Sequence, residues 1–308
     1  MVQKNSIKPK LIVITGPTAI GKSDVAVKIA KLFNGEIISA DSMQIYKGMD
    51  IGTGKITYEE MQGIPHYMLD VVDSYVNYSV GQYVEDATKC ITLVLKNNKT
   101  PVIVGGTGLY VTSLLNGSDF GNANTNEEIR DKWKHILDKE GKEFVYSRLK
   151  EIDPVSAEKI NVNDVKRVIR ALEIYEITGK PKSEVVSEIE SPYNALVIVM
   201  TAQDREVLYD RINRRVDKMF DKGLCSEVKK FIKYRSCNAL QAIGYKEVVN
   251  YLDGDISLEE AKELVKKNSR NYAKRQMTYF RGMRVNKIFV EYTDEAEIIK
   301  NVKEFLQD

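Results

Sequence analysis

Apolar residues recur along the chain in two alternating patterns, short continuous runs and longer segments with helical spacing. The short runs predict buried strands. They are Leu11–Ile14, Glu36–Ala40, Tyr67–Val72, Pro101–Val104, Ala195–Met200 and Ile288–Val290. Amphipathic segments such as Asp24–Phe33 lie between them. Strands that alternate with helices are typical of a parallel sheet covered on both faces, so the predicted fold class is α/β.

Two helix starts carry a specific sequence signature. Ser79 with Gln82, and Ser257 with Glu260, have the spacing of a capping box, in which each side chain satisfies a backbone N–H of the other's turn. The second pair predicts the start of a long helix that runs through a basic stretch of the chain.

The alternation of strands and helices stops near Gly117. A polar, loop-like stretch covers 121–126, and Glu127–Ser187 has helical periodicity without a strand-like run. Alternation resumes at Ala195. We therefore predict two domains: an α/β core formed by 1–117 and 193–308, which ends in long C-terminal helices, and an all-helical insertion domain at 118–192, located at the ligand edge of the sheet.

The composition sets broad limits on the class of protein. The 308 residues are 43% hydrophobic and 29% charged, as in ordinary water-soluble proteins. No apolar run approaches the ~20 residues that span a bilayer, and the N-terminus lacks the apolar region of a signal peptide. We therefore expect a cytoplasmic protein without a membrane partner. Three cysteines and two histidines in no ligand-like spacing argue against a zinc site.

A glycine-rich segment follows the first predicted strand directly and leads into a helix. It consists of Gly16, Pro17, Thr18, Ala19, Ile20, Gly21, Lys22 and Ser23. The two glycines allow a tight turn, so that successive backbone N–H groups face one concavity at a positive helix end. Lys22 can reach the outer phosphates, and the Ser23 hydroxyl is a candidate ligand for Mg²⁺. The segment predicts a P-loop that binds a polyphosphate, a feature also of nucleotide-binding and ATP-binding proteins.

Two further polar residues follow predicted strands. Asp41 comes directly after Glu36–Ala40, and Thr107 follows Pro101–Val104 in a Gly105-Gly106-Thr107-Gly108 segment. Ligands of open α/β folds bind at this carboxyl edge. Asp41 could therefore act on Mg²⁺ or accept a proton, but an Asx turn or helix cap explains it equally well. Gly105 and Gly106 are either a packing turn or a second approach of backbone to the ligand, and we favour the second interpretation.

The net charge of +2 conceals an uneven distribution. Residues 203–287 contain 20 Lys and Arg against 12 Asp and Glu, and Lys266–Lys287 contains eight basic residues and no acidic one. Within it Lys267, Arg270 and Lys274 recur at helical spacing, with aromatic residues between them. Such a face is typical of nucleic-acid binding. The alternative is a solvated surface helix, in which charges of both signs are normally mixed.

Eight segments then match the motifs of one family in order. They are Gly16–Ser23 (GPTAIGKS), Asp41–Thr53 (DSMQIYKGMDIGT), Pro65–Asp70 (PHYMLD), Gly105–Tyr110 (GGTGLY), Asp164–Glu173 (DVKRVIRALE), Arg215–Val228 (RVDKMFDKGLCSEV), Gln241–Glu247 (QAIGYKE) and Tyr272–Arg281 (YAKRQMTYFR). From Leu11 to about Arg281 the chain resembles the bacterial tRNA dimethylallyltransferases, also called tRNA isopentenyltransferases. It departs from the common pattern at Gly54-Lys55-Ile56 and at Tyr279, where relatives often have Ala-Lys-Pro and Trp.

The resemblance implies a reaction and a set of catalytic residues. A dimethylallyl group would pass from dimethylallyl diphosphate to N6 of the adenosine next to the anticodon on its 3′ side. Gly16–Ser23 would bind the diphosphate, with Mg²⁺ as cofactor held in part by Ser23. Asp41 would accept the proton from the adenine amino group, and Thr107 and Arg215 would bind the diphosphate or close the channel.

The resemblance also implies a partner, the anticodon stem-loop of tRNA. Its binding residues would come from four segments of the chain. They are Asp41, Ser42, Met43, Gln44 and Thr107 at the sheet edge, Arg130, Lys166, Arg167 and Arg170 in the insertion, Gln241, Gly244 and Tyr245 in the QAIGYKE motif, and Lys274 and Arg275 in the basic stretch.

Two other functions fit parts of the sequence. A P-loop small-molecule kinase would also place an acidic residue after its second strand, but it leaves the basic 266–287 stretch unexplained. A tRNA-binding module without catalysis would not need Lys22, Ser23 and Asp41 together. A monomer is the default expectation for the assembly state.

Overall fold

The computed structural model describes residues 8–117, 126–185 and 191–307. Contacts within the chain divide it into two compact units. The larger unit consists of 1–115 and 192–308, and the smaller one of 116–191. The predicted insertion, 118–192, begins and ends in or beside segments outside the described residues, so its boundaries stay a prediction. Among the described residues no helix is both long and apolar enough to cross a membrane.

The larger unit is built on a six-stranded sheet in which every pairing is parallel. Its strands are β1 (Lys10–Thr15), β2 (Gly35–Ser39), β3 (His66–Tyr67), β4 (Thr100–Gly105), β5 (Asn194–Thr201) and β6 (Lys287–Glu291). They lie in the order β3-β2-β4-β1-β5-β6, which places β1 between β4 and β5 at the centre. The predicted α/β class is thereby confirmed.

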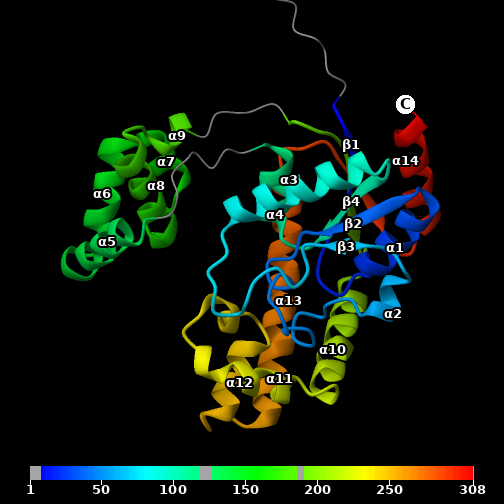
Figure 1. Ribbon diagram of the computed structural model, residues 1–308. Helices are drawn as coiled ribbons and strands as arrows, with labels where there is room; N and C mark the ends of the chain where they lie inside the picture. Colours follow the sequence, from blue (N-terminus) through cyan, green and yellow to red (C-terminus); the bar gives the residue numbers. More distant parts are fainter. Residues whose placement is uncertain (1–7, 118–125, 186–190, 308) are drawn as a thin grey trace, which may run out of the picture. The chain divides into compact units, whose positions relative to one another are not determined.

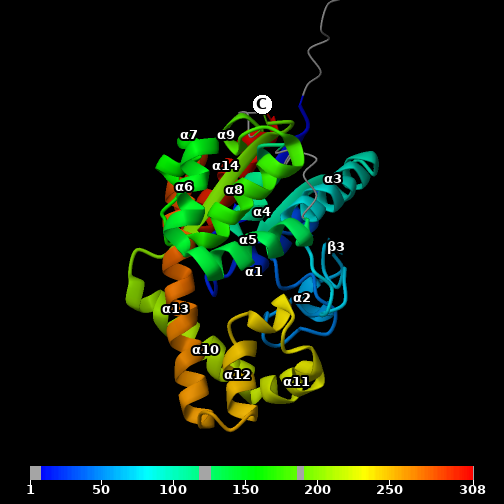
Figure 2. The ribbon, with the colours of Figure 1, turned by 90° about the vertical axis from the view of Figure 1, so that its left-hand side faces the viewer.

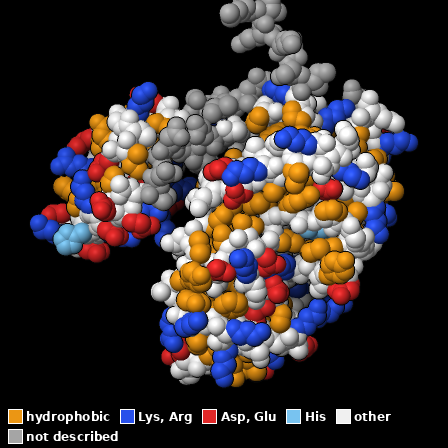
Figure 3. Space-filling model, in the orientation of Figure 1, with side chains coloured by type: hydrophobic (Ala, Val, Ile, Leu, Met, Phe, Trp, Pro, Cys, Tyr) orange, Lys and Arg blue, Asp and Glu red, His pale blue; other side chains and the backbone are white. Residues whose placement is uncertain are grey.

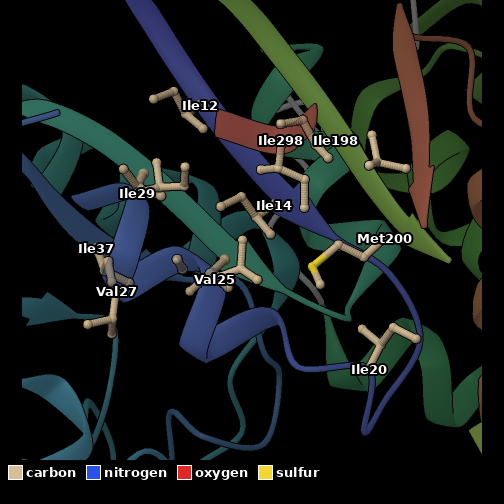
Figure 4. Close-up of a cluster of buried hydrophobic side chains, with 14 of the residues drawn as sticks. Ile12, Ile14, Ile20, Val25, Val27, Ile29, Ile37, Ile198, Met200 and Ile298 are labelled. Carbon is tan, nitrogen blue, oxygen red and sulfur yellow. The ribbon is translucent and has the colours of Figure 1, made fainter. Parts of the chain in front are cut away.

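Helices cover both faces of this sheet (Figure 1). In the larger unit they are α1 (Lys22–Leu32), α2 (Tyr58–Met61), α3 (Val80–Lys96), α4 (Gly108–Leu115), α10 (Arg205–Asp221), α11 (Leu224–Phe231), α12 (Tyr245–Leu252), α13 (Leu258–Gly282) and α14 (Glu295–Gln307), with short 3₁₀ turns at Ile232–Tyr234 and Asn238–Gln241. On one face β1 and its neighbours pack against α1 and α14, as the side chains of Ile14, Ile29 and Ile298 illustrate (Figure 4). On the other face the sheet packs against α3, α4 and the end of α13.

A third apolar cluster lies beyond the sheet and fixes a loop. Ile45, Tyr46 and Met49 pack there against α11 and α12. The segment 43–54, which follows the end of β2, is therefore held by helices from the C-terminal half of the chain. Figure 2 shows α10, α11, α12 and α13 gathered at one end of the larger unit.

The described residues of the smaller unit form helices joined by turns, without a strand. It comprises α5 (Glu127–Glu140), α6 (Lys142–Ile152), α7 (Pro154–Lys159), α8 (Val165–Thr178) and α9 (Lys182–Val185). Its core forms around Trp133, Leu149 and Leu172. Acidic and basic side chains are interspersed over the face that Figure 3 presents.

The structure corrects one predicted strand and confirms both capping boxes. The run Tyr67–Val72 was predicted as a strand, but β3 ends at Tyr67. Met68 and Asp70 have φ angles of 62° and 53°, in the left-handed region that breaks a strand, and pairing resumes only at an isolated bridge between Val72 and Tyr46. The reciprocal hydrogen bonds of the capping boxes that begin at Ser79 and Ser257 are both present.

A phosphate cradle and the cavity beside it

The segment Gly16–Ser23, called the cradle below, joins β1 to α1 and has the backbone geometry of a P-loop. Gly16 and Gly21 have φ angles of 145° and 100°, which favour glycine. A Cβ on Gly16 would lie 2.5 Å from the carbonyl oxygen of Met200 on β5, so the close packing requires glycine. Ala19 also lies in the left-handed region, at a φ of 64°. The conformation of the cradle is therefore held by its surroundings.

Three side chains from the C-terminal half of the chain contact the tip of the cradle. Gln276 accepts a hydrogen bond from the backbone N–H of Thr18 at 2.9 Å, and Arg215 donates to the Thr18 hydroxyl at 3.2 Å. Arg211 donates from Nε to the carbonyl of Ala19 at 2.9 Å. Helices α10 and α13 thus position the loop that the N-terminal half contributes.

Lys22 points into a region of concentrated charge. Its Nζ donates to the carbonyl of Pro17 at 2.8 Å. Burial, followed by the positive charge of Arg215, lowers the pKa of Lys22 to about 7, and the Asp41 carboxylate acts in the opposite direction. Two cations beside a P-loop concavity are an arrangement that an anion would stabilise.

Asp41 forms an Asx turn, which the sequence analysis gave as the alternative to a chemical role for this residue. Its Oδ1 accepts the backbone N–H of Met43 at 2.9 Å and that of Gln44 at 3.4 Å, an Asx turn. Both bonds end on the same oxygen, so the turn positions the carboxylate without excluding reactivity at Oδ2. Thr107 adjoins it, since its hydroxyl accepts the N–H of Ser42 at 3.0 Å.

One cavity of about 880 Å³ in the larger unit brings many of the predicted site residues together. Those that line it are Thr18, Ala19, Gly21, Lys22, Ser23, Asp41, Ser42, Met43, Gln44, Arg215, Gln241, Tyr245 and Arg275. The predicted residues Gly16, Pro17, Ile20, Thr107, Gly244 and Lys274 belong to the same unit and are not part of the lining. The four predicted basic residues of the insertion belong to the smaller unit.

Four residues of this region were not singled out from the sequence. Arg211, Tyr272 and Gln276 line the cavity, and Glu227 supports the segment beside it. Burial, with the nearby Asp41 carboxylate, raises the pKa of Tyr272 to about 12. Three of the four lie inside recognised motifs, but without the tertiary structure those motifs do not indicate which member faces the cavity.

Glu227 organises the turn that holds Arg215. Its carboxylate accepts the backbone N–H groups of Asp50 (2.9 Å), Ile51 (2.8 Å) and Gly52 (3.0 Å) and the hydroxyl of Tyr245 (2.6 Å). Arg215 in turn donates to the carbonyl of Thr53 at 3.1 Å. Tyr245, predicted to bind tRNA, has a fully buried side chain. The Tyr245 side chain therefore supports this turn, and a role in tRNA binding stays a prediction.

Two predicted RNA-binding arginines of the smaller unit surround a buried carboxylate. Arg130 and Arg170 donate to Glu173 at 3.0 and 2.7 Å, and Glu173 is fully buried on α8. Removing either arginine would leave buried charge poorly compensated, so both have a structural task whatever else they bind. Arg167 pairs with Asp164 at the surface, and Lys166 is exposed.

The basic stretch on α13 is less uniform than its sequence indicated. Lys266 forms an ion pair with Asp217 of α10 at 2.8 Å, and Arg270 donates to Asn213 at 2.6 Å. Lys267 and Lys274 are exposed. The packing of α10 against α13 therefore brings an acidic side chain to a stretch whose own sequence has none. Lys267 and Lys274 stay available to bind a partner.

The glycines after β4 serve packing, and the favoured interpretation, a second approach of backbone to the ligand, stays a prediction. A Cβ on Gly105 would lie 2.2 Å from the carbonyl oxygen of Ala40, and one on Gly106 would lie 2.4 Å from Nε2 of Gln276. A Cβ on Gly108 would lie 2.3 Å from the ring of Tyr279. Gly105 and Gly106 also line the cavity, so close packing and proximity to a ligand coincide there.

The parallel sheet, the glycine-rich loop between β1 and α1, and the residues Lys22 and Ser23 define the class: the protein is a P-loop α/β protein. Comparison with known sequences narrows this class. The family model described as IPP transferase matches residues 44–283, and the chain belongs to that family. The resemblance seen in the sequence motifs is thereby confirmed.

Individual relatives are similar to this chain along almost its whole length. A tRNA dimethylallyltransferase of Thermoanaerobacter sp. (strain X514) is 47% identical over 306 residues, 96% of this chain and 97% of that protein. The crystal structure of a full-length tRNA isopentenylpyrophosphate transferase from Bacillus halodurans is 43% identical, with a TM-score of 0.74 over 97% of both chains. A eukaryotic dimethylallyltransferase, described as acting on tRNA, is 31% identical, with a TM-score of 0.80 over 96% of this chain and 77% of its own.

Proposed function

We propose that this protein transfers a dimethylallyl group from dimethylallyl diphosphate to N6 of the adenosine that adjoins the tRNA anticodon on its 3′ side. The observation that carries the proposal is that one cavity is lined both by Lys22 and Ser23 of the cradle and by Asp41. In the proposed reaction a diphosphate leaves the donor and the acceptor loses a proton. A phosphate-binding loop suits the first event, and a carboxylate facing the same cavity suits the second. The names of the family's relatives support this choice of donor group and acceptor.

The donor half of the cavity is suited to a leaving diphosphate. The cradle offers backbone N–H groups at the N-terminus of α1, and Lys22 and Arg215 add two cations beside them. As the C–O bond of the donor breaks, negative charge grows on the diphosphate, and fixed donors stabilise that charge without reorganising. Arg215 is held in place by Thr18 and Thr53, so its geometry is set before the ligand binds.

Mg²⁺ in this cavity would be held mainly through the diphosphate, with Ser23 as a protein ligand. Among the described residues no group of three or more His, Cys, Asp or Glu side chains could hold a metal ion. Mg²⁺ commonly keeps several waters and takes one or two protein oxygens beside substrate phosphates. The exposed Ser23 hydroxyl at the cavity surface is such an oxygen. Bound there, Mg²⁺ would neutralise charge on the leaving group.

The acceptor half centres on Asp41. In the proposed step the adenine N6 attacks the allylic carbon, a C–N bond forms, the C–O bond to the diphosphate breaks, and the N6 proton passes to the Asp41 carboxylate. The target base must leave its stack to enter the cavity, at a cost of a few kcal/mol. Thr107 fixes the backbone next to Asp41 through Ser42, which holds the Asp41 carboxylate at the cavity.

A labelled-donor assay tests the proposal. We expect label to pass from dimethylallyl diphosphate to an anticodon stem-loop, and no label to pass from [γ-³²P]ATP to any product. Transfer of phosphate from ATP, with no prenyl transfer, would support the P-loop kinase alternative. Binding of the stem-loop with neither transfer would indicate an RNA-binding module. A monomeric state and a cytoplasmic location stay predictions beside this one.

Donor binding should depend on pH through Lys22. Because the pKa of Lys22 is about 7 in the free protein, the side chain is mostly neutral at pH 8. A bound diphosphate favours the ammonium form and raises that pKa, so binding takes up a proton, and affinity falls by up to about tenfold per pH unit above 7. Calorimetry with inorganic diphosphate at pH 8, in two buffers of different ionisation enthalpy, measures the uptake.

The variant Lys22→Met is the control for that measurement, since diphosphate itself also titrates. We expect an uptake close to one proton more in the parent than in the variant. Equal uptake by the two proteins would show that Lys22 is already charged before binding.

Binding of tRNA should depend on salt through the exposed cations of α13. Each phosphate contact contributes a slope of roughly −0.7 to −0.9 in log affinity against log salt. We expect Lys274→Ala combined with Arg275→Ala to flatten the slope by about one to two units. The matched control is Lys229→Ala with Lys230→Ala, two exposed lysines at the end of α11. Equal slopes in the two double variants would mean that α13 only carries a solvated face.

A further inference from the structure

Gln276 on α13 has a buried side chain, and both the oxygen and the nitrogen of its amide form hydrogen bonds. It is only 5% exposed. Its Oε1 accepts the backbone N–H of Thr18 at 2.9 Å, and its Nε2 donates to the carbonyl of Gly106 at 2.8 Å. These bonds join three segments that are distant in the sequence: the cradle, the loop after β4 and the long C-terminal helix.

The packing around Gln276 is built for this connection. A Cβ on Gly106 would lie 2.4 Å from Nε2 of Gln276, so the residue at position 106 must be glycine for the amide to reach the backbone. The same Cβ would lie 3.6 Å from Nζ of Lys22 and 3.6 Å from the carbonyl oxygen of Gly16. Gln276 therefore sits directly behind the donor half of the cavity.

The two hydrogen bonds require an amide in one orientation. The atom facing Thr18 must accept a hydrogen bond, and the atom facing Gly106 must donate one. A carboxylate of the same shape only accepts, and an apolar side chain of the same length does neither. The residue after Gly106 is Thr107, whose hydroxyl holds the turn of Asp41 through Ser42. One amide thus links the phosphate side of the cavity to the carboxylate side.

We propose that Gln276 is the positioning residue of this site: it holds the cradle tip in its anion-binding conformation and sets that tip at a defined distance from the Thr107 and Asp41 side. The proposal rests on the function proposed above. The cradle tip needs such support, because Ala19, beside Thr18, adopts a left-handed φ of 64° that a residue with a side chain disfavours. Without the Gln276 amide, the donor would have to order the cradle tip as it binds. The free energy spent on that ordering would weaken donor binding.

Two variants of Gln276 separate its two bonds. Gln276→Met keeps the volume and loses both bonds, and Gln276→Glu keeps the acceptor toward Thr18 but turns a carboxylate toward the carbonyl of Gly106. We expect inorganic diphosphate to bind about tenfold or more weakly in both, and most weakly in Gln276→Glu because its charge repels the anion. KM for the donor should rise, and kcat should fall as well because the two sides of the cavity lose their register.

The control is Asn271→Asp, which adds the same charge to an exposed position of α13. It should leave the affinity for diphosphate within about twofold of the parent. Affinity for the anticodon stem-loop, measured without diphosphate, should be unchanged in both Gln276 variants. That readout distinguishes a local role at the cradle from general damage to the helix, and thermal unfolding reports whether each variant is folded.

The possible results separate this inference from the proposed function. A parent protein that does not bind diphosphate would overturn the proposed function. If the parent binds diphosphate and both Gln276 variants bind it within about twofold, the positioning role is wrong. Loss of diphosphate and stem-loop binding together in the Gln276 variants would also overturn it, since Gln276 would then serve the fold of the whole unit.

Discussion

Asp41→Asn is expected to lower the single-turnover rate of prenyl transfer by about 10²–10⁴, the usual contribution of a general base. The amide keeps an Oδ1 that accepts the N–H groups of Met43 and Gln44, so the turn after β2 stays intact. It cannot accept the proton that the adenine amino group loses. Quenched mixing of enzyme, stem-loop and labelled donor at saturating concentrations measures the rate of the chemical step.

The matched control for this substitution is Asp24→Asn. Asp24 is an exposed carboxylate in the first turn of α1 that lines the same cavity. The two variants change the net charge equally, but only Asp41 is placed next to Ser42 and Thr107. A rate for Asp41→Asn within a few-fold of the parent would remove Asp41 from the proposed proton transfer and leave it the structural role of its turn.

Lys22→Ala should weaken binding of the donor diphosphate by roughly 10- to 100-fold, since a hydrogen bond to a charged group contributes about 1.5–3 kcal/mol. Affinity for the tRNA stem-loop should stay nearly unchanged, because the RNA cations proposed on α13 are separate from the cradle. Calorimetry with a non-hydrolysable donor analogue and filter binding of the stem-loop give the two affinities. An equal loss of both would contradict the assignment of the cradle to the donor alone.

Lys31→Ala provides the comparison within the same helix. Lys31 lies in the last turn of α1, is exposed, and bonds to the side chain of Gln62 at the surface. It loses the same charge from α1 without touching the cavity. We expect its donor affinity to remain at the parent value, which would attribute the effect at Lys22 to its position at the head of the cradle.

Local sequence determined the scaffold of this protein, because the relevant physics acts over a few residues. Continuous apolar runs between turns indicated the strands. Gly16 and Gly21 indicated a phosphate-binding loop through the tight turn that they allow, and Lys22 through its ammonium group. The one strand predicted too long, Tyr67–Val72, failed where two residues adopt a left-handed conformation. Apolar composition does not report such a change. In the structure the N–H groups of Asp70 and Val71 bond to the carbonyls of Gln44 and Ile45 instead of continuing the strand.

Only the tertiary structure decided how charge and hydrogen bonds are shared between distant segments. The stretch 266–287 contains no acid, yet Asp217 neutralises Lys266 across a helix contact. Tyr245 belongs to a motif predicted to bind RNA, yet it is buried on Glu227. Sequence spacing determines which residues share a face of one helix. Which face meets which loop depends on the packing of the whole core, and so the amide of Gln276 behind the cradle could be recognised only in three dimensions.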